Sequence, residues 1–261
     1  MLDTQIIGKL TDRVMAAQDG AQAITKLTDE YPHMTIEDSY AVQDELRRRW
    51  IARGERITGL KAGLTSKAKM AQMGVKVPSF GVLSSAMARP ENSAIQIDEL
   101  VHPRVEAEIA FVMREELKGG DCTIEQVIEA TDFVLPAVEI IDSRYEKFKF
   151  DLVSVVADNG SSSRYVTGGR PMNPRALDLR TIGVVIEING VIRDLGASAA
   201  VMNHPANAIV ILLQHLAARD ESLPVGSLVL TGGITAAIAV SRGDAVNARF
   251  QNMGSVSFTF K

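Results

Sequence analysis

Three glutamates in apolar surroundings are the side chains of this sequence best suited to chemistry. Glu106 and Glu108 stand two positions apart in residues 104–113, where Val105, Ala107, Ile109 and Phe111 alternate with them, and Glu139 lies in a second apolar run at 132–142. Alternate residues of a β-strand share a face, which would place Glu106 and Glu108 roughly 7 Å apart. Spacing alone favours a solvated strand face. The alternative is a divalent cation held by three carboxylates, a donor set that suits Mg²⁺ or Mn²⁺ better than zinc.

The composition limits the classes of function. The chain has 261 residues, 46% hydrophobic and 23% charged, with a formal net charge of −4. These values suit one large domain, or a main domain with a small appendage, and give no basic field to attract nucleic acid or an anionic membrane. The single cysteine, Cys122, excludes an internal disulfide. With no signal-peptide pattern and no membrane-length apolar run, the sequence predicts a soluble, cytoplasmic protein.

A helical segment is expected before the glutamates, over residues 1–58. Its first helix ends near Gly20, and a second begins at Thr35, where Asp38 completes a capping box, and ends at Gly54. Apolar residues recur at helical spacing in both helices and predict packing faces: Ile6, Ile7, Leu10, Val14, Val42, Leu46 and Trp50.

The remainder, residues 59–261, predicts a β-rich catalytic body and an α+β fold. Residues 104–113 and 132–142 form strands, with Pro136 marking an edge strand or a bulge in the second. Asn189-Gly190 joins two apolar runs as a tight hairpin. A helix is expected over 205–218, and the C-terminal VNARFQNMGSVSFTF predicts two final strands.

Four segments together resemble the fumarylacetoacetate hydrolase superfamily: HPRVEAEIAFV, PAVEIIDSR, GLKAGLTSKAKMAQMGV and VADNGSSSRYVTGG. The similarity extends through the C-terminal LTGGIT and GDAVNARFQNMGSVSFTF, and is greatest to the hydratase/decarboxylase branch of meta-cleavage pathways for aromatic compounds. In this context Glu-x-Glu followed by Glu139 favours the metal site over the solvated face.

The resemblance implies a fold and a set of site residues. The fold is a mixed β-sandwich or roll body of the family's C-terminal-domain type, with Mg²⁺, or alternatively Mn²⁺, on Glu106, Glu108 and Glu139. Lys61 would be the catalytic residue in contact with substrate, and its apolar neighbours favour a pocket over the surface position common for lysine. The implied substrate-binding residues are Leu64, Ser161, Gly233 and Thr235.

Ordinary turn chemistry is an equal alternative for Ser161 and for the turn formed by Gly233, Ile234 and Thr235. Asp158 and Asn159 are expected to hold the loop before Ser161 through backbone hydrogen bonds.

The implied reaction is metal-dependent decarboxylation of 2-oxo-3-hexenedioate (4-oxalocrotonate) to 2-hydroxypenta-2,4-dienoate and CO₂. Since a 2-oxo acid can chelate one cation through its carboxylate and carbonyl oxygens, no covalent cofactor is needed. The alternative is a 2-hydroxypenta-2,4-dienoate hydratase of the same branch. Such hydratases tend to carry an acidic residue in a Pro-Asp-Tyr-Gly or similar segment, whereas this chain has Pro78-Ser79-Phe80-Gly81, which favours decarboxylation.

Other classes lack their signatures. No nucleotide-binding glycine motif, G-x-S-x-G or cysteine cluster is present. The His33–Glu37 and His102–Glu106 pairs do not support a carbon–carbon hydrolase, because the first lies at a helix start and the second uses a proposed metal ligand. A non-catalytic scaffold partner is a further alternative, against which the intact glutamate set argues. The expected partners are a small 2-oxo dicarboxylic acid, a sister hydratase and further copies of this chain in a homo-oligomer.

Overall fold

Helices open the chain, and their bounds agree with the sequence pattern. The computed structural model describes residues 1–66, 70 and 78–261, so part of the segment GLKAGLTSKAKMAQMGV, residues 67–69 and 71–77, lies outside the described residues. The N-terminal helices are α1 (Thr4–Asp19), α2 (Leu27–Glu30) and α3 (Ile36–Ala52). Thr35 and Asp38 form the expected capping box at the start of α3. Among the described residues, no helix has both the length and the hydropathy to cross a membrane.

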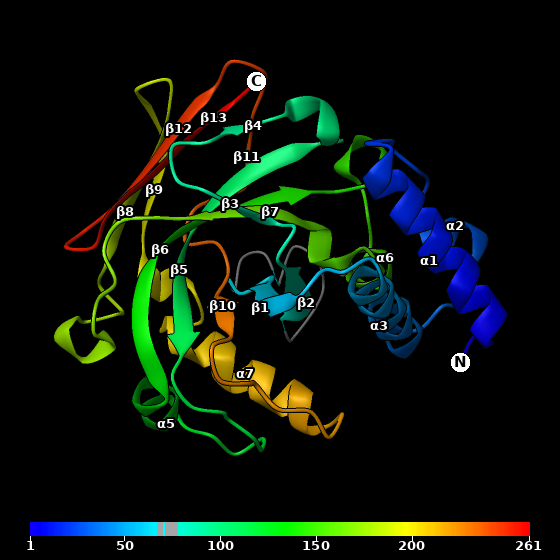
Figure 1. Ribbon diagram of the computed structural model, residues 1–261, viewed down its shortest axis with the longest axis horizontal. Coiled ribbons are helices and arrows are strands. Elements are labelled where there is room, and N and C mark those ends of the chain that lie inside the picture. Colours follow the sequence, from blue (N-terminus) through cyan, green and yellow to red (C-terminus); the bar gives the residue numbers. More distant parts are fainter. Residues whose placement is uncertain (67–69, 71–77) are drawn as a thin grey trace.

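A large mixed sheet follows, and it carries both glutamate-bearing strands. Its path runs β2-β1-β10-β5-β6-β7-β3, with β11 paired to β5 (Figure 1). The bounds of its strands are β1 (Ile57–Gly63), β2 (Ser79–Ser84), β3 (Ala88–Arg89), β5 (Pro103–Met113), β6 (Thr131–Asp142), β7 (Ser162–Thr167), β10 (Leu228–Leu230) and β11 (Ile238–Ala239).

A second sheet and the later helices complete the fold. The sheet has the order β4-β13-β12-β8-β9. The expected hairpin is confirmed, since Asn189 and Gly190 take the positive φ values of 56° and 76° that a tight turn needs. The bounds of these elements are β4 (Ala94–Ile95), β8 (Gly183–Ile188), β9 (Val191–Ala197), β12 (Ala245–Phe250), β13 (Gly254–Phe260), α5 (Ile124–Glu129), α6 (Leu152–Ala157) and α7 (Pro205–Ala217).

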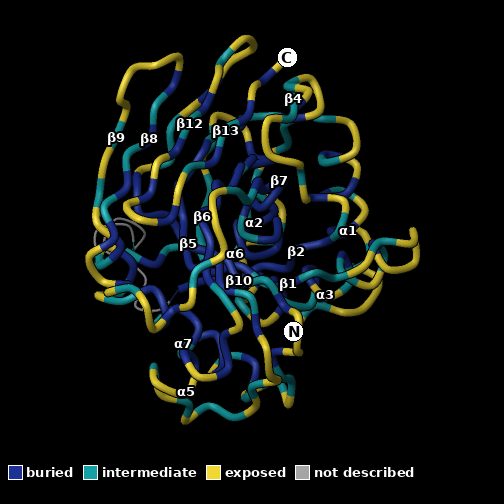
Figure 2. Tube along the Cα trace, turned by 60° about the vertical axis from the view of Figure 1, so that its left-hand side comes forward, coloured by how far each residue is buried: buried dark blue, intermediate teal, exposed yellow. Residues whose placement is uncertain are grey.

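The two faces of β5 serve different cores. Val105, Ala107 and Ile109 face a core shared with the five-stranded sheet and α7. Ala110, on the opposite face, belongs to a second core shared with the N-terminal helices. Figure 2 shows β5 and β6 buried along most of their length, whereas β9 is largely exposed. A carboxylate on the Ala110 face of β5 therefore lies on the side of the large sheet that faces the second core.

Pro136 lies inside the large sheet, so the expectation of an edge strand is wrong. β6 is paired on both sides, with β5 and with β7. The Pro136 carbonyl accepts a hydrogen bond from Gly168 N at 3.1 Å, on the side of β7, where the paired register ends at Ala137. Because the N and O atoms of one antiparallel residue point to the same neighbour, the missing N–H falls just beyond that ladder. The register irregularity of the β6–β7 pair lies between Ile140 and Ile141, not at the proline.

A buried ion pair fixes the loop that leads into β7. Arg144 and Asp158 are 2% and 0% exposed, and Asp158 accepts from both the backbone N and the guanidinium Nε of Arg144. Burial raises the pKa of Asp158 to about 6, although Arg144 opposes the shift. Arg144 also donates to the carbonyl oxygens of Asp158 and Ser162, which joins the two ends of the loop.

Replacing Asp158 by asparagine leaves the Arg144 charge buried without its counter-charge. We expect Asp158→Asn to lower the free energy of unfolding by about 3 kcal/mol, measured by urea denaturation. Asp178→Asn, which removes the acid from the exposed Asp178–Arg180 pair, is the matched control and should change the free energy of unfolding far less. Equal losses in the two variants would contradict the structural role of the buried pair.

Candidate active site

Glu106, Glu108 and Glu139 meet in the middle of the large sheet. The register places Glu106 directly opposite Glu139, and Glu108 follows two positions along β5 on the same face. One carboxylate oxygen from each lies within 4.8 Å of the others. The side chains are buried, with exposures of 7%, 0% and 0% in sequence order. The alternative of a solvated strand face is therefore wrong.

The cluster has the chemistry of a divalent cation site. Glu108 Oε2 accepts from Gly232 N at 2.6 Å, but within the described residues Glu108 Oε1 and Glu139 Oε1 accept no hydrogen bond, and Glu139 Oε2 has only the Lys61 ammonium beside it. Burial, followed by the charges of Glu139 and Glu106, raises the pKa of Glu108 well above its ordinary value. Buried carboxylate oxygens without donors need a neutralising partner. Oxygen-only donors fit Mg²⁺, so the residues present suit that ion.

Lys61 reaches this cluster from β1. Its Nζ lies 3.2 Å from Glu139 Oε2, and the side chain is 3% exposed, so the surface alternative for Lys61 is wrong. Glycines make room for it: a Cβ on Gly81 would lie 3.2 Å from Lys61 Cγ, and one on Gly160 would lie 3.3 Å from Lys61 Cε. The Lys61 ammonium thus lies beside the carboxylate of Glu139 within the cluster.

Gly233 and Thr235 belong to a loop that fixes β5. Thr235 Oγ1 accepts from Ala107 N at 3.1 Å, and Ile234 N donates to Ala107 O at 2.9 Å. A Cβ on Gly233 would lie 2.9 Å from Glu106 Cδ, so only glycine lets the backbone pass this carboxylate. Both residues lie beside the glutamates but do not line the adjoining cavity. Their contact with substrate stays a prediction.

A cavity of about 480 Å³ opens beside Lys61 and Glu106. Leu64 and Ser161 line it, as expected of substrate-binding residues, and both have a φ of 59°. Ser161 Oγ is buried and has no hydrogen-bond partner among the described residues. Asn159 exchanges hydrogen bonds of 2.8 and 2.9 Å with the backbone of Val82, which confirms that it holds this loop. Strained residues at a cavity wall are typical of functional sites.

Sequence reasoning did not single out Arg104 and Phe148, which line the same cavity. Arg104 stands two positions before Glu106 on β5 and so shares its face. Its spacing from Glu106 could therefore have identified Arg104 as a candidate site residue from the sequence. The position of Phe148 depends on a turn in which Lys147 and Phe148 both have a φ of 57°, and no local pattern in the sequence predicts it.

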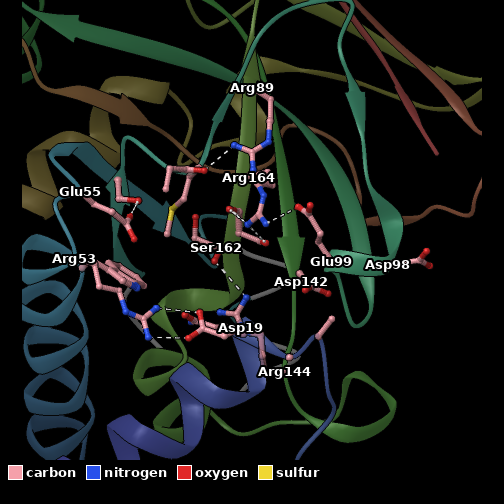
Figure 3. Close-up of a pocket in the computed structure, with 18 residues that line it drawn as sticks. Asp19, Arg53, Glu55, Arg89, Asp98, Glu99, Asp142, Arg144, Ser162 and Arg164 are labelled. Atoms are coloured by element: carbon pink, nitrogen blue, oxygen red, sulfur yellow. Dashed lines mark hydrogen bonds and ion pairs between the residues drawn. The ribbon is translucent and has the colours of Figure 1, made fainter.

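A second cavity, of about 530 Å³, lies between the N-terminal helices and the sheet (Figure 3). Two ion pairs lie within it: Figure 3 shows Arg53 paired with Asp19, and Arg164 with Glu99. It contains none of the residues that the sequence marks for chemistry. We therefore assign the chemistry to the cavity beside the three glutamates.

Comparisons with known proteins agree with this geometry. The family described as fumarylacetoacetate (FAA) hydrolase C-terminal matches residues 57–261. The chain is 52% identical over 251 residues to a 4-oxalocrotonate decarboxylase of Pseudomonas sp. (strain CF600), covering 96% of this chain and 95% of that protein. It is 37% identical over 266 residues to a 2-oxo-hept-4-ene-1,7-dioate hydratase of Escherichia coli, covering 100% of both.

A solved structure is also similar over the whole chain. It is that of 4-oxalocrotonate decarboxylase from Pseudomonas putida G7, complexed with magnesium and adipate. The TM-score is 0.98 at 48% identity, covering 100% of this chain and 99% of that one. The expected fold class and family resemblance are thereby confirmed.

The glutamate cluster predicts opposite effects of one substitution with and without metal. In EDTA, at a pH above the raised pKa of Glu108, Glu108→Gln removes one of three buried like charges, and we expect it to stabilise the protein by about 1 kcal/mol, a rise in Tm of about 2–4 °C. With Mg²⁺ the wild type should gain stability by binding and the variant should not. Glu115→Gln, at an exposed glutamate, is the control. A variant that Mg²⁺ stabilises as much as the wild type would contradict the site.

Mg²⁺ binding should release protons. Because the pKa of Glu108 is raised in the folded protein, the metal-free fold loses stability as the pH rises above the ordinary glutamate range, and a proton competes with the cation. We expect the affinity for Mg²⁺ to increase with pH. Titration calorimetry in buffers of different ionisation enthalpy measures the protons released, and a value of zero at every pH above the ordinary glutamate range would be inconsistent with this electrostatic picture.

Proposed function

Since this chain belongs to the fumarylacetoacetate (FAA) hydrolase family, we propose that it is a magnesium-dependent decarboxylase of 2-oxo-3-hexenedioate (4-oxalocrotonate). The observation that carries the proposal is the buried trio of Glu106, Glu108 and Glu139 beside Lys61, at the end of a cavity large enough for a small dicarboxylic acid. Relatives named for this activity are about half identical to the chain over nearly its full length.

Hydration is less well supported, because it needs an acid/base group near the distal carbons of the substrate. Among the described residues, Glu106 is the only carboxylate lining the cavity, and no histidine lines it. Ser79, which stands in the segment where related hydratases tend to carry an acidic residue, lines the cavity wall. The sequence of residues 67–77 contains no Asp, Glu or His. The hydratase relative is also the more distant one, at 37% identity.

The reaction is a vinylogous β-keto acid decarboxylation. The C5–C6 bond breaks and C6 leaves as CO₂; its electron pair forms C4=C5, the former C3=C4 pair becomes C2=C3, and the carbonyl oxygen on C2 takes the charge and then a proton. The Mg²⁺ held by Glu106, Glu108 and Glu139 would supply the Lewis acid at the 2-oxo acid end. No covalent cofactor is required.

The side chains of the protein supply binding and charge balance. The Lys61 ammonium, held beside Glu139, donates to the substrate and balances the charge that develops on the C2 oxygen. Ser161 Oγ is a second donor, since its hydroxyl lies at the cavity wall without a described partner. The apolar wall near Ile141, Phe150 and Val155 keeps water from the departing carboxylate.

This proposal includes the wider organisation expected from the sequence. Every described cavity-lining residue comes from the body at 59–261, which supports assigning catalysis there and packing to residues 1–58. A role in the catabolism of aromatic compounds follows from the substrate. A homo-oligomer, a complex with a sister hydratase and a cytoplasmic location stay predictions.

The decisive assay follows CO₂ release and absorbance on 2-oxo-3-hexenedioate with Mg²⁺, with and without EDTA. We expect CO₂ release that EDTA abolishes. In Lys61→Met, kcat/KM should fall by about 100-fold or more while Mg²⁺ binding persists, and Lys118→Met, at an exposed lysine, should behave as the wild type. Absence of CO₂ release, with metal-dependent consumption of 2-hydroxypenta-2,4-dienoate in a parallel cuvette, would instead make the protein a hydratase.

A further inference from the structure

Arg104 extends the line of chemical side chains along β5. Arg104, Glu106 and Glu108 occupy alternate positions of the strand and therefore one face of the sheet, with roughly 7 Å between successive side chains. Arg104 and Glu106 both line the 480 Å³ cavity. The cavity thus has an acidic, metal-binding end and a cationic end on the same strand.

The guanidinium of Arg104 is held in place by contacts other than an ion pair with any described carboxylate. Its Cζ lies 4.1 Å from the centroid of the Phe148 ring, and its Nη1 donates to Ala237 O at 3.5 Å. Within the described part of the chain, it forms no ion pair with a carboxylate. The ring beneath it is fixed by the turn at Lys147 and Phe148, where both residues have a φ of 57°. A positioned, half-buried cation with no acidic partner is suited to binding an anion from the cavity.

We propose that Arg104 binds the distal carboxylate of the substrate and thereby selects 2-oxo dicarboxylic acids over 2-oxo monocarboxylic acids. The inference rests on the proposed function, because it takes the 2-oxo acid end to lie at the glutamates. The carboxyl carbons of an extended six-carbon diacid lie roughly 6 Å apart. This distance is close to the spacing of roughly 7 Å between Glu106 and Arg104, two positions apart on β5. The planar guanidinium can hold a carboxylate by two parallel hydrogen bonds.

Arg104 contributes to binding and specificity rather than to the chemical step. The distal carboxylate carries its full charge in the bound substrate and loses it as CO₂ forms. An ion pair to Arg104 is therefore stronger in the ground state than in the transition state. Loss of the ion pair should raise KM and leave kcat unchanged or higher. Among the described residues, the other cations lining the cavity are Lys61, paired with Glu139, and Lys149, which is exposed.

A pair of ligands that differ only in the second carboxylate tests this role. Titration calorimetry on the Mg²⁺-loaded protein would compare 2-oxoadipate with 2-oxohexanoate. In Arg104→Met, we expect Kd for 2-oxoadipate to rise about tenfold or more, and Kd for 2-oxohexanoate to change less than about twofold. Arg104→Lys should recover part of the difference. Arg193→Met, at an exposed arginine on β9, makes the same change in net charge and should leave both values unchanged.

The outcomes separate this inference from the proposed function. Equal weakening of both ligands in Arg104→Met would overturn it, as would unchanged binding of both. Loss of the preference in Lys149→Met instead would assign the distal carboxylate to Lys149 and also overturn it. Because binding is measured without turnover, a protein that discriminates through Arg104 but releases no CO₂ would disprove the decarboxylase and leave the inference standing. Circular dichroism of each variant checks that it is folded.

Discussion

Like charges on neighbouring strands repel each other, and burial strengthens the repulsion because water no longer screens it. Glu106 and Glu139 face each other across the β5–β6 pair, and Glu108 lies beside them on the same dry face. Among the described residues, Lys61 supplies one positive charge beside Glu139, and Gly232 N donates one hydrogen bond to Glu108. Glu108 Oε1 has no donor among them, and the burial of three carboxylates together favours the binding of a divalent cation.

The position of the cluster at the centre of the sheet has a mechanical consequence. β5 and β6 are paired on both sides, and the loop after β10 adds hydrogen bonds from Thr235 and Ile234 to the β5 backbone. Carboxylates on such strands cannot move apart to relieve their repulsion without breaking the sheet. The energy of the sheet therefore holds the donors together before any ion binds, which reduces the reorganisation that binding requires.

Much of this arrangement can be predicted from the sequence, because it depends on local patterns. Four elements can each be predicted from a few neighbouring residues: the strand at 104–113, the capping box at Thr35, the turn at Asn189-Gly190 and the helix over 205–218. The resemblance to a known family joined Glu139 and Lys61 to the other two glutamates. What the sequence did not reveal depends on pairing between distant segments. The place of Pro136 in an interior strand follows from where β7 ends, and the surroundings of Lys61 follow from glycines on β2 and on the loop before β7.

Both ends of the cavity lie along β5, but the far end also depends on a connecting segment. The acidic end belongs to interior strands whose two faces pack against different cores. At the other end, Arg104 is again on β5, but Phe148, whose ring lies beneath its guanidinium, and Lys149 come from a connecting segment after β6. Mutational tolerance should therefore be strongly asymmetric along one cavity. During evolution, substitutions in the segment after β6 could change which group is recognised at the far end, while the three glutamates stay unchanged.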